Sequence, residues 1–208
     1  MQILIVAATQ PEIQPLTDHF GIQKPFDILI TGVGMAATAF ALGKHLAANQ
    51  YDLMINLGIA GSFDRRIALG DVVEITEDRF AELGAQDDEA FIPIETLGFG
   101  QSVYYPTAKL ADYIDRPQLT PAKAITVNTV HGHEESIAKI SHRLQPQLES
   151  MEGAAFFYAG NQTGIPCLQI RAVSNYVEKR NRDNWKIGLA IKNLNNFAIG
   201  LINHYGDT

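Results

Sequence analysis

The sequence is poor in cysteine, and its single copy, Cys167, cannot form a disulfide within the chain. No cluster of Cys and His has the spacing of zinc ligands, and no apolar run approaches the ~18 residues of a membrane-spanning helix. The first residues, Met1–Val6, lack the basic region of a secretory signal. These absences predict a protein of a reducing compartment, the cytoplasm, with no membrane as a partner.

Positive charge is also scarce, because 16 Lys and Arg residues against 23 Asp and Glu give a net charge of −7. Proteins that bind duplex nucleic acid are usually basic, so this balance disfavours nucleic acid as a partner. Apolar residues form 46% of the chain and charged residues 19%, which is typical of a globular protein with a sizeable core. The length predicts a single domain over residues 1–208.

Short apolar runs alternate with amphipathic segments along the chain, and this alternation predicts the fold class. The runs that predict strands are Gln2–Ala8, Asp27–Thr31, Asp52–Leu57, Asp71–Thr76, Ile125–Val130, Leu148–Met151 and Pro166–Val173. The intervening segments predict helices, the last from about Asn184. We therefore expect an α/β fold, a three-layer α/β/α sandwich with a mixed, largely parallel central sheet. Residues 78–104 are loop-rich and acidic, which predicts an excursion from this core.

Ligands bind at the carboxyl ends of the strands in such sheets, so residues that follow strands are the candidates for a site. Glu12 and Glu152 each lie at a predicted helix start. Each is either a functional carboxylate or an acid whose charge interacts favourably with the helix dipole. Arg171 lies within an apolar strand and needs a carboxylate or a polar ligand as its partner. Asn175 follows Ser174 at the end of this strand, as a ligand contact or as a turn residue.

Glycines at residues 32 and 34, with Ala37, fit the G-x-G-x-x-A pattern of dinucleotide binding. In this sequence, however, the pattern follows the second strand and not the first. The dinucleotide pattern also needs an acid at the end of the next strand, whereas Asp52 lies at the start of that strand. A tight turn with close helix packing explains the same glycines, and so does a backbone that approaches a ribose or an anion.

Two other kinds of chemistry have weak support. His131, His133 and Glu134 have no further metal ligand nearby, so we expect no metal. The chain has no Gly-x-Ser-x-Gly nucleophile elbow, and Cys167 lies in the middle of a predicted strand as a core residue. We therefore expect neither covalent hydrolase chemistry nor a cofactor.

Six segments together resemble the purine nucleoside phosphorylase and nucleosidase superfamily over nearly the whole chain. In chain order they are Glu12, Gly32–Gly34, Asn56–Gly61, Leu69–Val73, Met151–Ala155 and Ile170–Asn175. Within the superfamily, the sequence is most similar to the futalosine hydrolase family of the alternative menaquinone pathway. The residues that carry this finer similarity are Leu83–Asp87, Thr126–Val130, Ser174–Glu178, Arg182 and Trp185.

The resemblance implies a hydrolase of a small nucleoside that acts as a homodimer or a larger homo-oligomer. It implies that Glu12 activates water with the help of Arg171, and that Met151 and Glu152 hold the ribose. The other substrate contacts that we expect are Gly58, Ile59, Ala60, Val130, His131 and Ser174. Phosphorylases of the family hold phosphate with arginines, but residues 8–12 and 54–58 contain none. Because a dianion binds poorly without cations, we expect water as the nucleophile, although Arg65 and Arg66 lie close in sequence.

Asn175 departs from the pattern of the adenine-specific nucleosidases, which have an aspartate there that protonates the purine. Ile59 departs as well, because those enzymes have a serine at this position. An amide donates hydrogen bonds but is no acid, and a 6-oxopurine offers a ring nitrogen and an oxygen side by side as acceptors. Asn175 therefore predicts hypoxanthine, the base of futalosine, as the leaving group. We expect residues 78–104 to close over the 5′ substituent.

Three other functions stay open at this point. They are a methylthioadenosine/S-adenosylhomocysteine nucleosidase, a phosphate-dependent purine nucleoside phosphorylase and a catalytically silent nucleoside-binding module.

Overall fold

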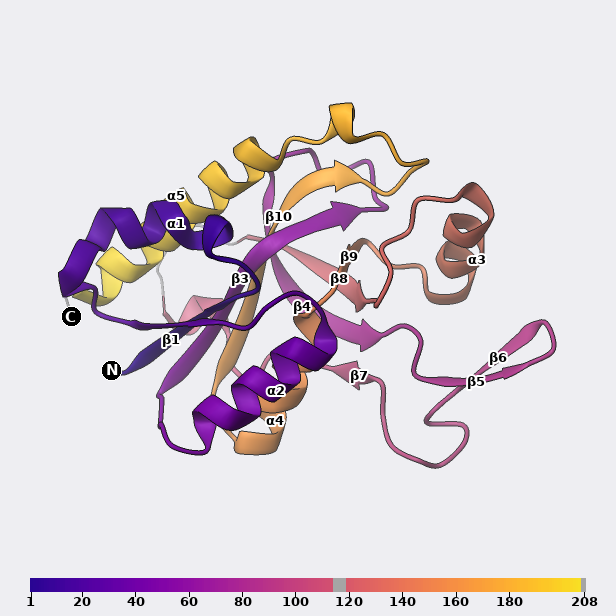
Figure 1. Ribbon diagram of the computed structural model, residues 1–208, viewed down its shortest axis with the longest axis horizontal. Coiled ribbons are helices and arrows are strands. Elements are labelled where there is room, and N and C mark those ends of the chain that lie inside the picture. Colours follow the sequence, from indigo (N-terminus) through magenta and orange to yellow (C-terminus); the bar gives the residue numbers. More distant parts are fainter. Residues whose placement is uncertain (114–118, 207–208) are drawn as a thin grey trace.

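An eight-stranded mixed sheet forms the centre of the computed structural model, which describes residues 1–113 and 119–206 (Figure 1). Its strands are β1 (Ile3–Ala7), β2 (Asp27–Ile30), β3 (Leu53–Ser62), β4 (Val72–Phe80), β7 (Val103–Tyr104), β8 (Thr120–Thr126), β9 (Leu148–Ser150) and β10 (Cys167–Tyr176). β1 is parallel to β2 and β3, and β10 is parallel to β3. β4 runs antiparallel to β10 but parallel to β8. The predicted mixed, largely parallel sheet is confirmed.

The sheet also closes on itself, which the sequence did not predict. β3 pairs with β10 on one side and, through Gly61 and Ser62, with β9 on the other. Because β9 continues through β8 and β4 back to β10, these five strands form a ring. The carboxyl-terminal halves of β3 and β10 thus lie inside a closed set of strands.

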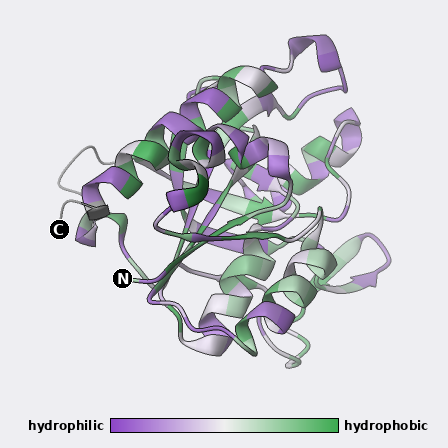
Figure 2. Cartoon of the chain, turned by 60° about the vertical axis from the view of Figure 1, so that its left-hand side comes forward, coloured by the Kyte–Doolittle hydropathy of each residue, from purple (hydrophilic) through white to green (hydrophobic). Residues whose placement is uncertain are grey.

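Helices cover both faces of the sheet and complete the three predicted layers. α1 (Gln10–Phe20) and α5 (Ile187–Gly206) pack together on one face, and α2 (Met35–Leu46) and α4 (Gly153–Thr163) on the other (Figure 1). α3 (Glu134–Leu144) lies to one side, and short 3-10 turns cover Gly21–Gln23, Leu110–Asp112 and Arg182–Asn184. Figure 2 shows hydrophilic and hydrophobic residues alternating along α1 and α5, as expected of helices with one buried face.

Two apolar clusters hold these layers together. Ile13 and Leu16 of α1 and Leu194 of α5 pack on the sheet from one side, and Phe156 and Phe157 of α4 pack on it from the other. Since β1 is covered on both faces, all five of its residues are buried and apolar. Cys167 is fully buried in β10, so the prediction that it is a core residue is confirmed. No helix in the described part of the chain is long and apolar enough to cross a membrane.

Some predicted strand bounds were wrong. β3 does not end at Leu57 but continues through Gly58–Gly61 to Ser62, because this segment has pairing partners on both sides. The strand predicted at Ile125–Val130 is β8, which ends at Thr126. Residues 78–104 contain the end of β4, β7 and the hairpin of β5 (Gly84–Asp87) and β6 (Ala90–Pro93), which forms a sheet of its own and projects from the core, as the predicted excursion implied (Figure 1).

Asp78 of β4 is fully buried between strands of the ring. Its carboxylate accepts hydrogen bonds from Thr126 Oγ1 of β8 at 2.8 Å and from Gln169 Nε2 of β10 at 3.1 Å. Burial nevertheless raises the pKa of Asp78 to about 6, because loss of water outweighs these bonds. The folded protein is therefore less stable when Asp78 is ionised than when it is protonated.

We expect Asp78 to lower the free energy of unfolding as pH rises from 4 to 7, with a share of about 2 kcal/mol. The sign follows because the folded state holds the proton of Asp78 up to a higher pH than the unfolded state does. In Asp78→Asn this share disappears, and Gln169 has an unpartnered Oε1 that can accept from the new amide. Urea unfolding of both proteins across this pH range measures the difference. Equal pH slopes would contradict it.

Candidate active site

A cavity of about 370 Å³ opens at the carboxyl ends of β1, β3 and β10. It lies where the sequence predicted a site, since ligands of such sheets bind at this edge. Most of the predicted site residues line it, namely Glu12, Ile59, Ala60, Val130, His131, Met151, Glu152, Ser174 and Asn175. Gly58 and Arg171 do not line it, and their positions are described below.

Glu12 is a buried carboxylate that three donors hold in place. Thr9 precedes α1 and donates its backbone N and its Oγ1 to Glu12 Oε2, both at 2.9 Å, so the predicted helix start is confirmed. The backbone N of Ile59 donates to Oε1 at 3.1 Å. A carboxylate has about four acceptor positions, so one remains for a water or a ligand in the cavity.

The chain segment that carries Glu12 is itself fixed from α5. Asn195 donates its Nδ2 to the carbonyl oxygen of Glu12 at 2.8 Å and accepts from the backbone N of Leu16 at 2.9 Å. Asn195 is buried, so its amide anchors the first turn of α1 from within the protein. Glu12 is thus rigidly placed at the cavity wall.

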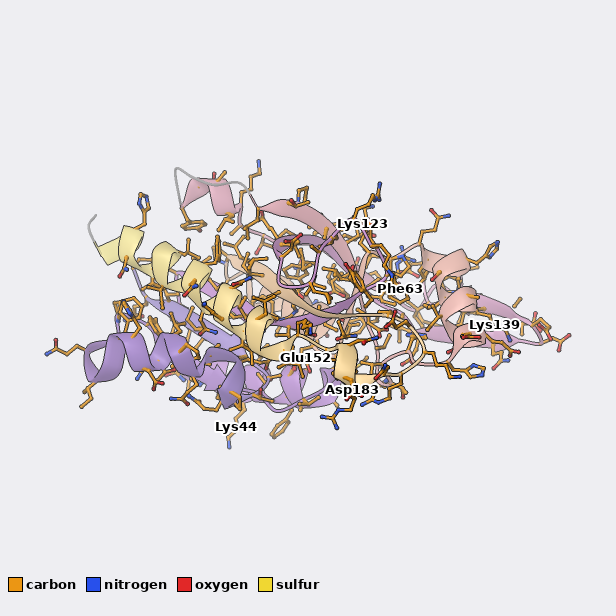
Figure 3. The ribbon with its side chains drawn as sticks, turned by 90° about the horizontal axis from the view of Figure 1, so that it is seen from above. Lys44, Phe63, Lys123, Lys139, Glu152 and Asp183 are labelled. Carbon is orange, nitrogen blue, oxygen red and sulfur yellow. The ribbon has the colours of Figure 1, made fainter. Side chains whose placement is uncertain are left out.

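Glu152 is a second buried carboxylate of the cavity, directly before α4. Gly34 donates its backbone N to Oε1 at 2.9 Å, and Met151 donates its backbone N to Oε2 at 3.2 Å. Two acceptor positions remain, which suits a pair of neighbouring hydroxyl groups. Figure 3 shows Glu152 within the molecule, near the start of α5, whereas Lys44 projects outward from the edge.

The glycines of the G-x-G pattern now have a physical role. Gly32 and Gly34 have φ angles of 84° and 100°, in the region that favours glycine. This turn directs the N–H of Gly34 at the carboxylate of Glu152. The backbone thus approaches an anion, as one sequence interpretation proposed, and the anion is a side chain of the protein itself.

We expect Gly34→Ala to destabilise the protein by about 1–3 kcal/mol, because alanine is strained at this φ angle. An added Cβ would meet nothing within 4 Å, so the effect comes from the backbone alone. The shifted N–H also loosens Glu152, so the KM for the substrate rises. Gly43→Ala is the matched control, since Gly43 lies inside α2 with open space and is expected to gain stability. Equal thermal unfolding of both variants would contradict this account.

Asn175 lies at the end of β10, just past an irregularity in the strand. The register of β10 against β3 shifts between Val173 and Asn175, so Ser174 occupies a β-bulge. Ser174 Oγ donates to Asn175 Oδ1 at 2.8 Å, and Asn175 Nδ2 donates to the carbonyl oxygen of Tyr176 at 3.1 Å. These contacts fix the orientation of the amide and leave one N–H of Nδ2 without a partner among them.

Arg171 lies behind the wall of the cavity, where its side chain is only 2% exposed. Its guanidinium donates to Asn56 Oδ1, and its Nε has no partner. The sequence predicted a carboxylate or a polar ligand as the partner of Arg171. This prediction was wrong, because the partner is the amide oxygen of Asn56. A Cβ at Gly58 would collide with the guanidinium and lie 3.1 Å from Glu12 Oε1. Gly58 therefore leaves room for Arg171 next to Glu12, and neither residue faces the cavity.

Glu149 is a cavity residue that the sequence analysis missed. It is 3% exposed, and its two oxygens accept from the backbone N of His131 at 3.0 Å and contact His131 Nδ1 at 2.7 Å. Burial raises the pKa of Glu149, and the bonds from His131 oppose this rise. Its place in the short strand β9 gave no signal, because an acid in a strand is also typical of a solvent-facing position.

The rim of the cavity is formed by the segment after β10 and not by residues 78–104. Tyr176, Glu178, Arg180 and Trp185 line it, together with Ile187 and Ile191 from the start of α5. No residue of 78–104 is among the lining residues, so the expectation that this segment closes over the 5′ substituent stays a prediction. The sequence signal that existed was the finer similarity around residues 174–185.

The cations near the cavity are placed unfavourably for holding phosphate beside Glu12. Arg65 pairs with Glu178 and Arg66 pairs with Asp64, and neither lines the cavity. Arg180 does line it, but its guanidinium lies over the ring of Trp185, at 5.0 Å from the ring centroid. Arg171 is the arginine of the described residues that lies next to Glu12, but it is buried behind Gly58 and does not line the cavity, so it is not exposed to a phosphate there.

The fold and this site define the class to which the chain belongs: it is a member of the Phosphorylase superfamily, whose family model matches residues 2–203. It is 34% identical to the futalosine hydrolase of Streptomyces coelicolor over 182 residues, which are 84% of this chain and 77% of that protein. It is 30% identical to the 5′-methylthioadenosine/S-adenosylhomocysteine nucleosidase of Shewanella baltica, over 72% of this chain and 66% of that protein. Relatives with these names are N-glycosyl hydrolases, and the chain is a nucleosidase of this kind.

Solved structures share the whole fold at lower identity. The native futalosine hydrolase of Helicobacter pylori has a TM-score of 0.83 at 14% identity and covers 98% of this chain and 97% of its own. The 5′-methylthioadenosine/S-adenosylhomocysteine nucleosidase of Colwellia psychrerythraea, solved in complex with adenine, also has a TM-score of 0.83, at 22% identity, with coverage of 98% and 95%. The same architecture therefore occurs in proteins of both names.

Proposed function

We propose that this nucleosidase hydrolyses the N-glycosidic bond of a 5′-substituted 6-oxopurine nucleoside. The proposed substrate is futalosine, and the products are dehypoxanthine futalosine and hypoxanthine. The observation that carries the proposal is the amide of Asn175, whose oxygen is occupied by Ser174, so that its Nδ2 is the group left for a ligand. A donor at this point suits the O6 and N7 acceptors of hypoxanthine, whereas adenine has an amino group at position 6.

The ribose is assigned to Glu152 and the water to Glu12. Glu152 has two free acceptor positions for the two ribose hydroxyls, which hold the sugar at the cavity wall. As the bond between C1′ and the purine nitrogen N9 breaks, positive charge develops on the sugar. Glu12 accepts a proton from a water, whose oxygen forms the new bond to C1′. Asn175 donates to the departing base, which takes up a proton from solvent.

Arg171 acts in this proposal as a positioning residue. Its buried guanidinium lies behind Gly58, on the side of Glu12, and no ion pair within 4.0 Å neutralises it in the described residues. A positive charge there stabilises the negative charge that develops on the water oxygen as its proton moves to Glu12.

The phosphorylase alternative has less support, because the wall beside Glu12 lacks a cation that could hold a phosphate dianion. A methylthioadenosine/S-adenosylhomocysteine nucleosidase is the second candidate, and the similarity to relatives of that name favours it. Asn175 is the residue that argues against it. The proposal also includes a role in menaquinone biosynthesis, a cytoplasmic location and a homodimer or larger homo-oligomer, as implied by the futalosine hydrolase relatives and the single cysteine.

A panel of nucleosides tests the proposed substrate. Futalosine, inosine, methylthioadenosine and S-adenosylhomocysteine are incubated with the protein in phosphate-free buffer, and the released base is measured by chromatography. We expect hypoxanthine release from futalosine with the highest kcat/KM. Faster adenine release from methylthioadenosine would assign the enzyme to the second candidate, and saturable binding without release would assign it to a silent binding module.

A further inference from the structure

The wall of the cavity opposite Asn175 carries a carboxylate that the mechanism above does not use. In the sheet register, Glu149 of β9 lies opposite Gly61 of β3, and Gly61 lies opposite Asn175 of β10. Residues in one row of neighbouring strands project to the same face, with about 4.8 Å between strands. Glu149 and Asn175 therefore face the same space from two strands apart.

Gly61 forms the floor between these two side chains. A Cβ at this position would lie 3.1 Å from Asn175 Nδ2 and 3.5 Å from Glu149 Cγ. It would also lie 3.1 Å from Val177 Cγ2, so only glycine lets the amide and the carboxylate come this close to each other. The same cavity is lined by Gly61, Asn175 and Glu149. A flat heterocycle that lies against this wall can reach both polar groups with neighbouring atoms of one ring.

Glu149 is arranged to accept a hydrogen bond there. His131 contacts each of its oxygens once, through the backbone N and through Nδ1, which leaves further acceptor positions on the carboxylate. Within the described residues, no lysine or arginine pairs with Glu149. The ring of Phe63 packs edge-on against the ring of His131, at 6.2 Å between the centroids. A buried acceptor without a full set of partners is costly until a ligand donates to it.

A 6-oxopurine has the donor that this carboxylate needs. Its N1 carries a hydrogen, next to the O6 that Asn175 recognises, whereas N1 of a 6-aminopurine carries a lone pair. We propose that Glu149, held by His131, accepts the N1–H of the base and is a specificity-determining residue that rejects 6-aminopurines. This inference rests on the proposed function, and it assigns base selection to Asn175 and Glu149 together.

Inhibition by free bases tests the inference. In Glu149→Gln the new amide can turn either its oxygen or its NH₂ group to N1, so it accepts both kinds of base. We expect the ratio of the inhibition constants of adenine and hypoxanthine to fall at least about tenfold, as the loss of a charged hydrogen bond predicts. Glu82→Gln is the matched control, since Glu82 holds Asn128 of the same loop outside this cavity and its variant keeps the ratio. An unchanged ratio in Glu149→Gln would overturn the inference.

Two further measurements keep the test decisive if Glu149→Gln folds poorly. Glu149→Asp keeps the carboxylate, so it should bind hypoxanthine more weakly while retaining the preference. A crystal structure of the unmodified protein with hypoxanthine should place N1 within about 2.7–3.2 Å of a Glu149 oxygen. N1 directed elsewhere would overturn the inference, even if the enzyme releases hypoxanthine. Failure of the unmodified enzyme to act on any 6-oxopurine nucleoside would instead overturn the proposed function.

Discussion

Glu12→Gln is expected to lower kcat by about 10²–10⁴-fold, the usual contribution of a general base. Glutamine has nearly the shape of glutamate, and its oxygen can still accept from Thr9, but its amide cannot take a proton from water. The ribose and base contacts do not involve this residue, so KM should change much less than kcat. Turnover, KM and thermal unfolding are measured together.

Two companion variants make the result specific. Asp18→Asn changes an exposed acid on the same helix and should leave turnover unaltered. Glu12→Asp keeps a base but draws it back from the cavity, so it should retain more activity than Glu12→Gln. Near-normal turnover of a folded Glu12→Gln protein would remove Glu12 from the role of base.

Asn175→Asp is expected to shift the preference of the enzyme from 6-oxopurine toward 6-aminopurine nucleosides. An ionised aspartate repels O6, whereas a protonated one donates to N7 of either base. The kcat/KM of the 6-oxo substrate therefore falls more than that of the 6-amino substrate. The ratio of kcat/KM for futalosine over its 6-amino analogue should fall about tenfold to a hundredfold, which corresponds to one charged hydrogen bond. Paired kinetic assays on the two nucleosides measure the ratio.

The alanine variant separates loss of the amide from gain of the acid. Asn175→Ala should slow the hydrolysis of both nucleosides without favouring the 6-amino one, since alanine offers neither a donor nor a charge. If Asn175→Asp keeps the original preference, the assignment of Asn175 to the base is refuted, whatever the loss in rate.

Strand ends were the part of the site that the sequence could predict. Glu12 and Asn175 each follow a clear apolar run, and the parallel pairing of β1, β3 and β10 brings these runs to one edge of the sheet. Glu152 follows the short strand β9, which joins the same site although it runs antiparallel to β3. Local patterns were therefore sufficient for three side chains that lie far apart in sequence. The helix start at Thr9 was predictable for the same reason, because its signal is local.

Contacts between strands that are distant in sequence were not predictable. The segment Gly58–Gly61 has few side chains to form a periodic pattern, and it stays in β3 only because β9 and β10 pair with it. Glu149 reaches the cavity through the same pairing, which no local pattern encodes. The partner of Arg171 is Asn56 on a neighbouring strand, so burial alone indicated that a partner exists but not which one.

The most direct test of the central claim is the phosphate dependence of base release from futalosine. The account predicts that the purified enzyme releases hypoxanthine at the same rate with and without phosphate, and that the sugar product is unphosphorylated. Oxygen from ¹⁸O-labelled water should appear at C1′ of this product. Release that requires phosphate and gives a sugar 1-phosphate would contradict the account.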